Sequence, residues 1–242
     1  MEKLLSTSRR IEIVKENCSI IRERVAEAAL KSGRKPEDVR LMAVTKTVEP
    51  VLINTAIEQG ITLIGENRVQ EFLSKEPELH LEGVEKHLIG HLQKNKVRQI
   101  VGKVDMIESV DSVALAREID KRSEMQGIVT PVLLEVNIGE EDSKFGFSKE
   151  DLEQACAEIA TFEHLTVQGM MTIPPICEKK EEIRENFSKM HQLFIDFSSK
   201  IFNNINMNVL SMGMSADFEE AVLEGSTLVR VGSALFGERI YR

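Results

Sequence analysis

The sequence is poor in the features that mark secreted, metal-stapled or membrane proteins. It has three cysteines, an odd number at spacings that match no metal motif: Cys18, Cys156 and Cys177. We therefore expect free thiols in a reducing compartment. No stretch approaches the ~18 consecutive apolar residues of a membrane span. The first segment, MEKLLSTSRRIEIVKEN, is charged throughout and lacks the apolar centre of a signal peptide. A cytoplasmic protein is predicted.

Positive charge is also in deficit. The 242 residues include 31 Lys and Arg against 40 Asp and Glu, which gives a net charge of -9. We therefore expect no general affinity for nucleic acid or for an anionic membrane, and an anionic ligand needs local positive groups. The chain length fits one domain, 1–242, because α/β barrels commonly reach about 250 residues.

Helix-like and strand-like segments alternate along the whole chain. The first predicted strand, LMAVTK at 41–46, is continuously apolar before its polar end, as expected for a strand covered on both faces. Further strands are predicted at 61–65, 87–90, 105–110, 131–137, 165–170, 208–213 and 227–232. Helices are predicted at 3–31, 50–59, 67–75, 94–101, 112–125, 148–160, 179–201 and 216–224. This α/β pattern favours a (β/α)8 TIM-type barrel in a single domain with an extra N-terminal helix, over an open sheet.

Small polar residues follow the last two predicted strands. Such barrels carry their sites in the loops after the strands, and often bind phosphate after strands seven and eight. The segment SMGMS at 211–215 precedes a helix expected to begin around Ala216, whose backbone N–H groups suit an anion. Alternatively, Ser215 only caps that helix. Because VRVGS carries a second small turn, at Gly232 and Ser233, phosphate binding is the favoured interpretation.

Two cationic residues lie at predicted strand ends. Lys46 follows the first strand, where desolvation can lower its pKa and make the amine a nucleophile toward aldehydes. A solvated surface lysine is the alternative. Arg230 lies between two valines, and burying it there requires a partner. That partner is either a carboxylate such as Glu135 or an acceptor on a ligand.

Other candidates are weaker. The pair His87 and His91 lacks a third metal ligand, so hydrogen-bonded histidines are the favoured interpretation and no metal site is expected. Asn67 can donate to a ligand or cap a helix, and Lys144 reads as a solvated charge in a polar loop. Methionines gather at strand ends as adaptable packing or as a wall for a flat ring: Met170, Met171, Met212 and Met214.

Taken together, the motifs resemble the pyridoxal-phosphate homeostasis protein family, small pyridoxal 5'-phosphate (PLP) binding barrels related to the N-terminal domain of alanine racemase. They run in family order over nearly the whole chain: AVTKT, IGENRVQE, HLIGHLQKNK, EVNIGEEDSKFGF, GMMTIP, SMGMSADFEEAV and VRVGSALFG. The resemblance implies that Lys46 carries PLP as a Schiff base. It implies a cofactor-binding set of Lys46, Asn67, Ser211, Met212, Ser215, Arg230, Gly232 and Ser233. In that set Arg230 faces the pyridine nitrogen, and the serines and Gly232 contact the phosphate.

The expected function is intracellular PLP homeostasis without catalytic residues, by a monomer that passes PLP to PLP-dependent apoenzymes. The alternatives are a PLP-dependent racemase or decarboxylase, and a cofactor-free aldolase that uses Lys46 on a sugar phosphate. The racemases that this chain resembles take a tyrosine base from a second domain, whereas the only tyrosine here is Tyr241. Lys144 or His87 remain as alternative proton donors, so this difference favours homeostasis without proving it.

Overall fold

Eight parallel strands pair in chain order and close into a barrel, because β1 pairs with β8 as well as with β2. The computed structural model describes residues 6–139, 145–175, 177 and 179–237. The strands are β1 (Arg40–Val44), β2 (Leu63–Glu66), β3 (Glu85–Leu88), β4 (Met106–Val110), β5 (Thr130–Glu135), β6 (Leu165–Met171), β7 (Ile205–Met214) and β8 (Leu228–Val231). The predicted TIM-type barrel is confirmed.

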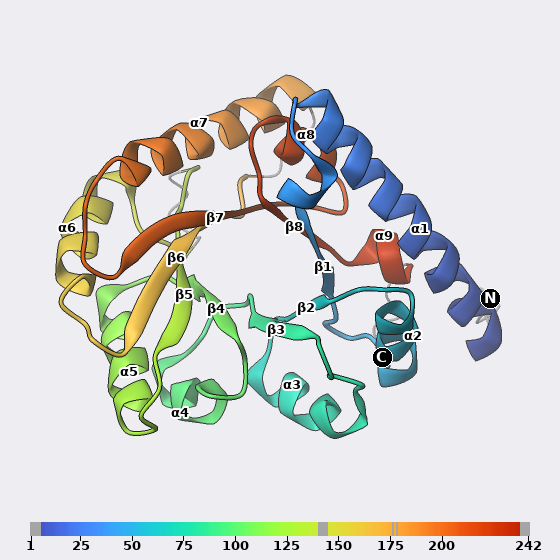
Figure 1. The fold of residues 1–242 in the computed structure, drawn as a ribbon, viewed down its shortest axis with the longest axis horizontal. Coiled ribbons are helices and arrows are strands. Elements are labelled where there is room, and N and C mark those ends of the chain that lie inside the picture. The colour runs from blue at the N-terminus through green and yellow to red at the C-terminus, as the bar shows by residue number, and fades with distance from the viewer. Residues whose placement is uncertain (1–5, 140–144, 176, 178, 238–242) are drawn as a thin grey trace.

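Helices surround the strands, as Figure 1 shows. They are α1 (Thr7–Lys31), α2 (Pro50–Glu58), α3 (Val69–Lys75), α4 (Val97–Ile100), α5 (Val113–Glu124), α6 (Lys149–Ile159), α7 (Lys180–Ser198), α8 (Phe218–Leu223) and α9 (Ser233–Phe236). Short 3-10 turns lie at Pro36–Asp38, Glu76–Glu78 and Lys94–Lys96. Among the described residues, no helix is long and apolar enough to cross a membrane.

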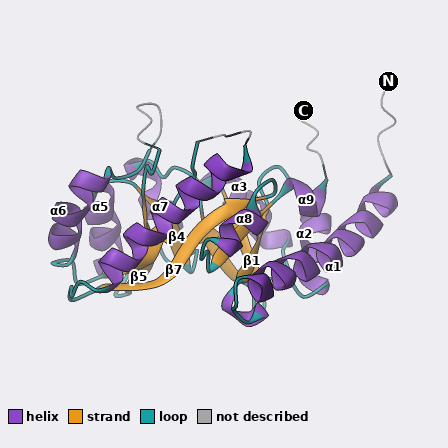
Figure 2. Ribbon diagram, turned by 90° about the horizontal axis from the view of Figure 1, so that it is seen from above, coloured by secondary structure: helices purple, strands orange, loops and turns teal. Residues whose placement is uncertain are grey.

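The extra N-terminal helix, α1, covers the side of the barrel where the first and last strands meet. It packs against α2, α8 and α9, and Figure 2 shows it extending along that side. Its buried face includes Val14, Cys18 and Ile21. Asn17 donates from Nδ2 to the carbonyl of Leu235 at 3.0 Å. The predicted extra helix therefore joins the two ends of the fold.

Neighbouring residues on one strand point to opposite sides of the barrel wall. In β1, Ala43 belongs to the apolar cluster beneath α1 and α2, whereas Met42 and Val44 belong to a cluster that also holds Leu63 and Leu228. Both faces of the strand are buried, which explains the uninterrupted apolar run in the sequence. The same alternation decides which polar side chains face the barrel interior.

The structure differs from the prediction around the last two strands. β7 extends to Met214, which pairs with Arg230 on β8, and α8 begins at Phe218 rather than around Ala216. The chain turns between them because the Asp217 carboxylate accepts the backbone N–H of Met214 at 2.6 Å. The loop that carries Ser215 is therefore not the start of α8.

Candidate functional site

Lys46 lies two residues beyond the end of β1, and its side chain is half-buried. The backbone N–H of Thr45 donates to the carbonyl of Gly65 at 2.9 Å, which continues the pairing with β2 past the formal end of the strand. Thr47 then adopts a positive φ of 61° and turns the chain toward α2. Lys46 thus stands at the carboxyl end of the strands, where barrels of this class carry their sites.

Arg230 occupies a deeper position in the neighbouring strand, β8. It pairs in register with Met42 on β1 and is 3% exposed. Its guanidinium donates from Nη1 to Ser211 Oγ at 2.6 Å and from Nη2 to the carbonyl of Thr172 at 2.8 Å. Burial lowers its pKa, while the nearby carboxylates, of which Glu108 acts most strongly, oppose that effect.

A chain of buried polar groups continues from Arg230 through the barrel. Ser211 Oγ donates to Glu108 at 2.6 Å, Glu108 lies 2.6 Å from His87 Nδ1, and His87 Nε2 lies 2.7 Å from Glu85. Burial opposes the charged imidazole, but hydrogen bonds to both carboxylates raise the pKa of His87 to about 9. The bond from His87 is the main reason that the pKa of Glu85 falls to about 2. The expectation of hydrogen bonds for His87 is confirmed.

Glu135, at the end of β5, interacts with the charge of Arg230. No hydrogen bond joins the two side chains in the described part of the chain. Burial raises the pKa of Glu135 to about 7, the Asp111 carboxylate adds to the rise, and Arg230 opposes it. From the sequence, the partner of Arg230 was either such a carboxylate or an acceptor on a ligand. The direct partners are instead a serine hydroxyl and a main-chain carbonyl, and Glu135 acts only through its charge.

Ser215 connects the loops after β7 and β8. Its Oγ accepts the backbone N–H of Gly232 at 3.0 Å and that of Ala234 at 3.3 Å. The proposed N-cap role of Ser215 on α8 is wrong, because Asp217 occupies the capping position of that helix. Ser215 caps the start of α9 instead, beside the exposed Ser233. The two loops predicted to bind phosphate therefore lie together.

Asn67 follows the end of β2, beside the end of β3. Its Oδ1 is buried and has no hydrogen-bond partner in the part of the chain that the structure describes. A Cβ on Gly90 would lie 2.3 Å from the carbonyl oxygen of Asn67, so only glycine permits this approach. The alternative that Asn67 caps the next helix is wrong, because Arg68 is the N-cap of α3.

Met212 and Ser211, two further members of the predicted binding set, point to opposite sides of β7. Met212 is fully buried in the apolar cluster between the barrel and its helices, with Leu210 and Ala221. Ser211 faces the barrel interior, where it bridges Glu108 and Arg230. The resemblance implied a place near the pocket for Met212 and a phosphate contact for Ser211. The structure packs Met212 in an apolar cluster and bonds Ser211 to Arg230.

The remaining candidates do not form a site with these residues. His91 is exposed, and its Nδ1 lies 3.0 Å from Oδ2 of Asp111. Its ring stacks on Phe145, with the ring centroids 3.8 Å apart. Lys144 and Tyr241 lie outside the described residues. Among the residues that are described, no group of three or more His, Cys, Asp or Glu side chains is placed to hold a metal ion.

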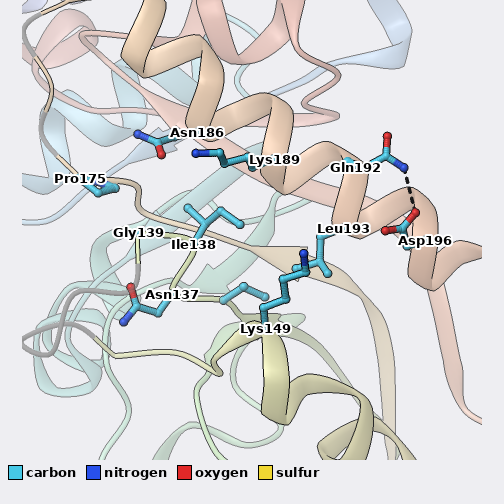
Figure 3. Close-up of a pocket in the computed structure, with 11 residues that line it drawn as sticks. Asn137, Ile138, Gly139, Lys149, Pro175, Asn186, Lys189, Gln192, Leu193 and Asp196 are labelled. Carbon is cyan, nitrogen blue, oxygen red and sulfur yellow. Dashed lines mark hydrogen bonds between the residues drawn. The ribbon is translucent and has the colours of Figure 1, made fainter.

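A separate cavity of about 490 Å³ lies between α7 and the loop after β5. Figure 3 shows Lys149 and Lys189 reaching toward it and the hydrogen bond from Gln192 to Asp196, which measures 2.9 Å. None of the predicted binding residues lines this cavity. The candidate site is therefore the barrel mouth over β1, β2 and β8, and not this side cavity.

Sequence reasoning missed the side chains that support the site. Neither Glu108 nor Thr172 was singled out from the sequence. A second group missed by the sequence, Glu66, Glu71 and Lys75, lies beside Lys46. Glu71 and Lys75 have the four-residue spacing of an ordinary helix pair, which does not by itself mark a shielded cluster.

The fold is similar to that of alanine racemases. Residues 16–240 match the family model of the alanine racemase N-terminal domain. The alanine racemase of Streptomyces coelicolor superposes with a TM-score of 0.71 at 18% identity, over 93% of this chain and 58% of the racemase. With a lysine following β1, the chain is a barrel of the alanine racemase N-terminal class.

Relatives in sequence identify the family within this class of barrels. A pyridoxal phosphate homeostasis protein from Aquifex aeolicus is 42% identical over 226 residues, 93% of this chain and 98% of the relative. The one from Escherichia coli K12 is 34% identical and covers 94% of this chain and 97% of the relative. The chain belongs to the pyridoxal phosphate homeostasis protein family. The structure of PipY from Synechococcus elongatus with PLP bound is 34% identical, with a TM-score of 0.78, over 90% of this chain and 100% of PipY.

Proposed function

We propose that this chain, acting as one barrel domain, holds PLP as a Schiff base on Lys46 and serves intracellular PLP homeostasis without dedicated catalysis. The observation that carries the proposal is the placement of a half-buried lysine just after β1 and of a buried arginine, Arg230, on the adjacent strand β8. A relative 34% identical, PipY, has been solved with PLP bound, and relatives at 34–42% identity are called homeostasis proteins.

The residues at the barrel mouth fit this cofactor. An aldehyde needs an amine within reach, and Lys46 supplies it. A pyridine nitrogen accepts a hydrogen bond, and the Arg230 guanidinium has more N–H groups than its two direct partners use. The buried amide oxygen of Asn67 has no hydrogen-bond partner among the described residues and can accept a hydrogen bond from a ligand. The backbone around Ser215, Gly232 and Ser233 offers N–H donors for a phosphate.

Bound PLP supplies an aldehyde that captures amines and a conjugated ring that withdraws electrons from them. Lys46 would hold the cofactor through its Nζ, because a primary amine condenses with an aldehyde with loss of one molecule of water. Arg230 stays charged and only donates hydrogen bonds, so it holds a pyridine nitrogen in its unprotonated form. An unprotonated ring withdraws electrons less strongly, which favours storage over carbanion chemistry.

The attachment is tested by borohydride reduction, proteolysis and mass spectrometry of PLP-loaded protein. We expect the pyridoxyl group on the peptide that contains Lys46. The Lys46→Ala protein should lose the absorption band of the linkage, and the exposed-surface variant Lys103→Ala should keep it. Label found mainly on Lys96 or Lys144 would contradict the assignment. A colourless wild-type protein would instead favour the cofactor-free aldolase.

The homeostasis role is tested by transfer. PLP-loaded protein is mixed with an apo-aminotransferase, and the activity that appears is compared with that from the same concentration of free PLP in the presence of a PLP-trapping phosphatase. We expect the loaded protein to protect PLP from the phosphatase and to restore aminotransferase activity. Failure of both protection and restoration would leave only the binding function.

A further inference from the structure

Two side chains of α3 hold the main chain on both sides of Lys46. Lys75 donates from Nζ to the carbonyl oxygen of Thr45 at 2.9 Å. Glu71 accepts the backbone N–H of Thr47 through Oε1. The residue before Lys46 and the residue after it are therefore both tied to the same short helix, by groups that carry charge and make the stronger class of hydrogen bond.

The two side chains belong to one shielded ion cluster. Lys75 pairs with Glu71, one turn earlier on α3, and with Glu66 at 3.2 Å. The exposed fractions of the side chains are 12% for Lys75, 19% for Glu71 and 2% for Glu66. Glu66 also accepts from the Thr45 hydroxyl at 3.1 Å. Ion pairs this shielded from solvent keep their geometry, because separating them would leave a buried charge without a partner or water.

The turn that the cluster holds is strained. Thr47 has a φ of 61°, and it is the one non-glycine residue at positive φ within the described ranges. A β-branched residue is costly in this region. Strain of this kind persists where surrounding contacts enforce it, and it gathers at functional sites. Here the enforcing contact is the Glu71 carboxylate on the Thr47 N–H.

We propose that Glu71 and Lys75 are positioning residues for Lys46: they fix its main chain so that the amine meets the aldehyde of PLP. They act on the linkage and not on the ring or phosphate, which lie with residues of other loops. The inference rests on the proposed attachment to Lys46. It predicts a selective loss of the covalent step, in which Lys46 Nζ gains the aldehyde carbon and water is released.

Two ligands separate the covalent step from the rest of binding. PLP binds with its aldehyde, whereas pyridoxine 5'-phosphate has an alcohol in that place and can only bind non-covalently. Dissociation constants for both ligands are measured on the full chain by fluorescence titration. The affinity ratio of the two ligands reports the linkage, while pyridoxine 5'-phosphate alone reports the pocket. Intact mass after borohydride gives the covalently loaded fraction.

We expect Lys75→Met and Glu71→Ala each to weaken PLP binding by about ten-fold and to leave pyridoxine 5'-phosphate within about two-fold of wild type. Lys75→Arg should restore most of the ratio, because it can still donate to Thr45 and to the carboxylates. The matched control is Lys31→Met, which breaks an exposed Lys–Glu pair of the same spacing with Glu27 on α1. It should leave both ligands unchanged.

Thr47→Gly tests the same idea without removing a charge, so it does not depend on the cluster variants folding. Glycine relieves the strained φ, and the protein should keep its melting temperature while PLP, but not pyridoxine 5'-phosphate, binds about three-fold more weakly. Equal affinity ratios in Thr47→Gly, Glu71→Ala and wild type would overturn the inference. So would a parallel loss of both ligands, which would make the cluster a general support of the pocket. If wild-type protein does not load at Lys46, the proposed function fails before this inference is reached.

Discussion

The imidazole of His87 and the carboxylate of Glu108 lie 2.6 Å apart inside the barrel, and both side chains are fully buried. Glu85 binds the other ring nitrogen, and the Ser211 hydroxyl links Glu108 to Arg230. Negative and positive groups therefore alternate along this chain of contacts. His87 and Arg230 both compensate the charge of the buried Glu108, and this arrangement keeps Arg230 in one place without a carboxylate in direct contact with it.

We expect His87 to be an imidazolium at neutral pH. Its folded pKa of about 9 lies above the ordinary value of 6.5, so its stabilising contribution is complete below pH 6.5 and is lost as the pH rises through 9. The measurement is a ¹⁵N NMR titration of the histidine side chains, with His87→Gln to assign the signal. Glu108→Gln should lower the transition. A His87 signal that titrates near or below 6.5 in the wild type would show that the ion chain is absent.

Glu135 should make the ligand-free protein less stable at high pH. Its folded pKa of about 7 lies above the ordinary 4.5, so the folded state binds the proton more tightly and stability falls as the pH rises from 4.5 through 7. The full difference corresponds to about 3 kcal/mol. Glu135→Gln should therefore raise the melting temperature at pH 8 and change it little at pH 5. The exposed Glu150→Gln on α6 is the control, and equal effects at both pH values would refute the assignment.

Ser215→Ala should weaken PLP binding about five-fold, because one neutral hydroxyl that joins two loops is worth roughly 1 kcal/mol. The backbone N–H groups of Gly232 and Ala234, which donate to Ser215 Oγ in the structure, survive the change and become free to bind a phosphate. Affinity is measured by absorbance titration, with Ser19→Ala on the exposed face of α1 as the matched serine variant. Complete loss of binding would mean that the hydroxyl itself, and not the main chain, holds the phosphate.

Amino acids should turn over slowly or not at all. An arginine beside the pyridine nitrogen leaves the ring a poor electron sink, and Arg230 is too well buried and bonded to move aside. Chiral analysis of alanine and other amino acids incubated with PLP-loaded protein checks this, with Lys46→Ala as the blank. Turnover of roughly 1 per second or more, absent from the blank, would favour the racemase or decarboxylase interpretation.

The barrel could be predicted from the sequence because each strand leaves its own local signal, an apolar run followed by a polar end. The orientation of Ser211 and Met212 could not. Both faces of such strands are buried, so no alternation of polar and apolar residues marks the inward side. The partner of Ser211 in the buried chain, Glu108, lies 103 residues away, a separation at which a single sequence carries no pairing signal.

The cluster beside Lys46 was hidden for a different reason. Glu71 and Lys75 have the spacing of an ordinary pair on an exposed helix face, and nothing local distinguishes a shielded pair from a solvated one. The positive φ of Thr47 could not be predicted either, because threonine rarely adopts this conformation and does not indicate such a turn. The predictable part of the site was thus its chemistry-bearing lysine and arginine, and the unpredictable part was what holds them.

The contact between Asn17 on α1 and Leu235 on α9 spans 218 residues of sequence. During synthesis, the apolar face of α1 is made long before its partners on α8 and α9. Closing so long a loop carries a large entropic cost and slows folding. The barrel closes through the pairing of β1 with β8, so it cannot close until translation has passed Val231. Until α8 and α9 have been made, α1 lacks the partners that complete its packing.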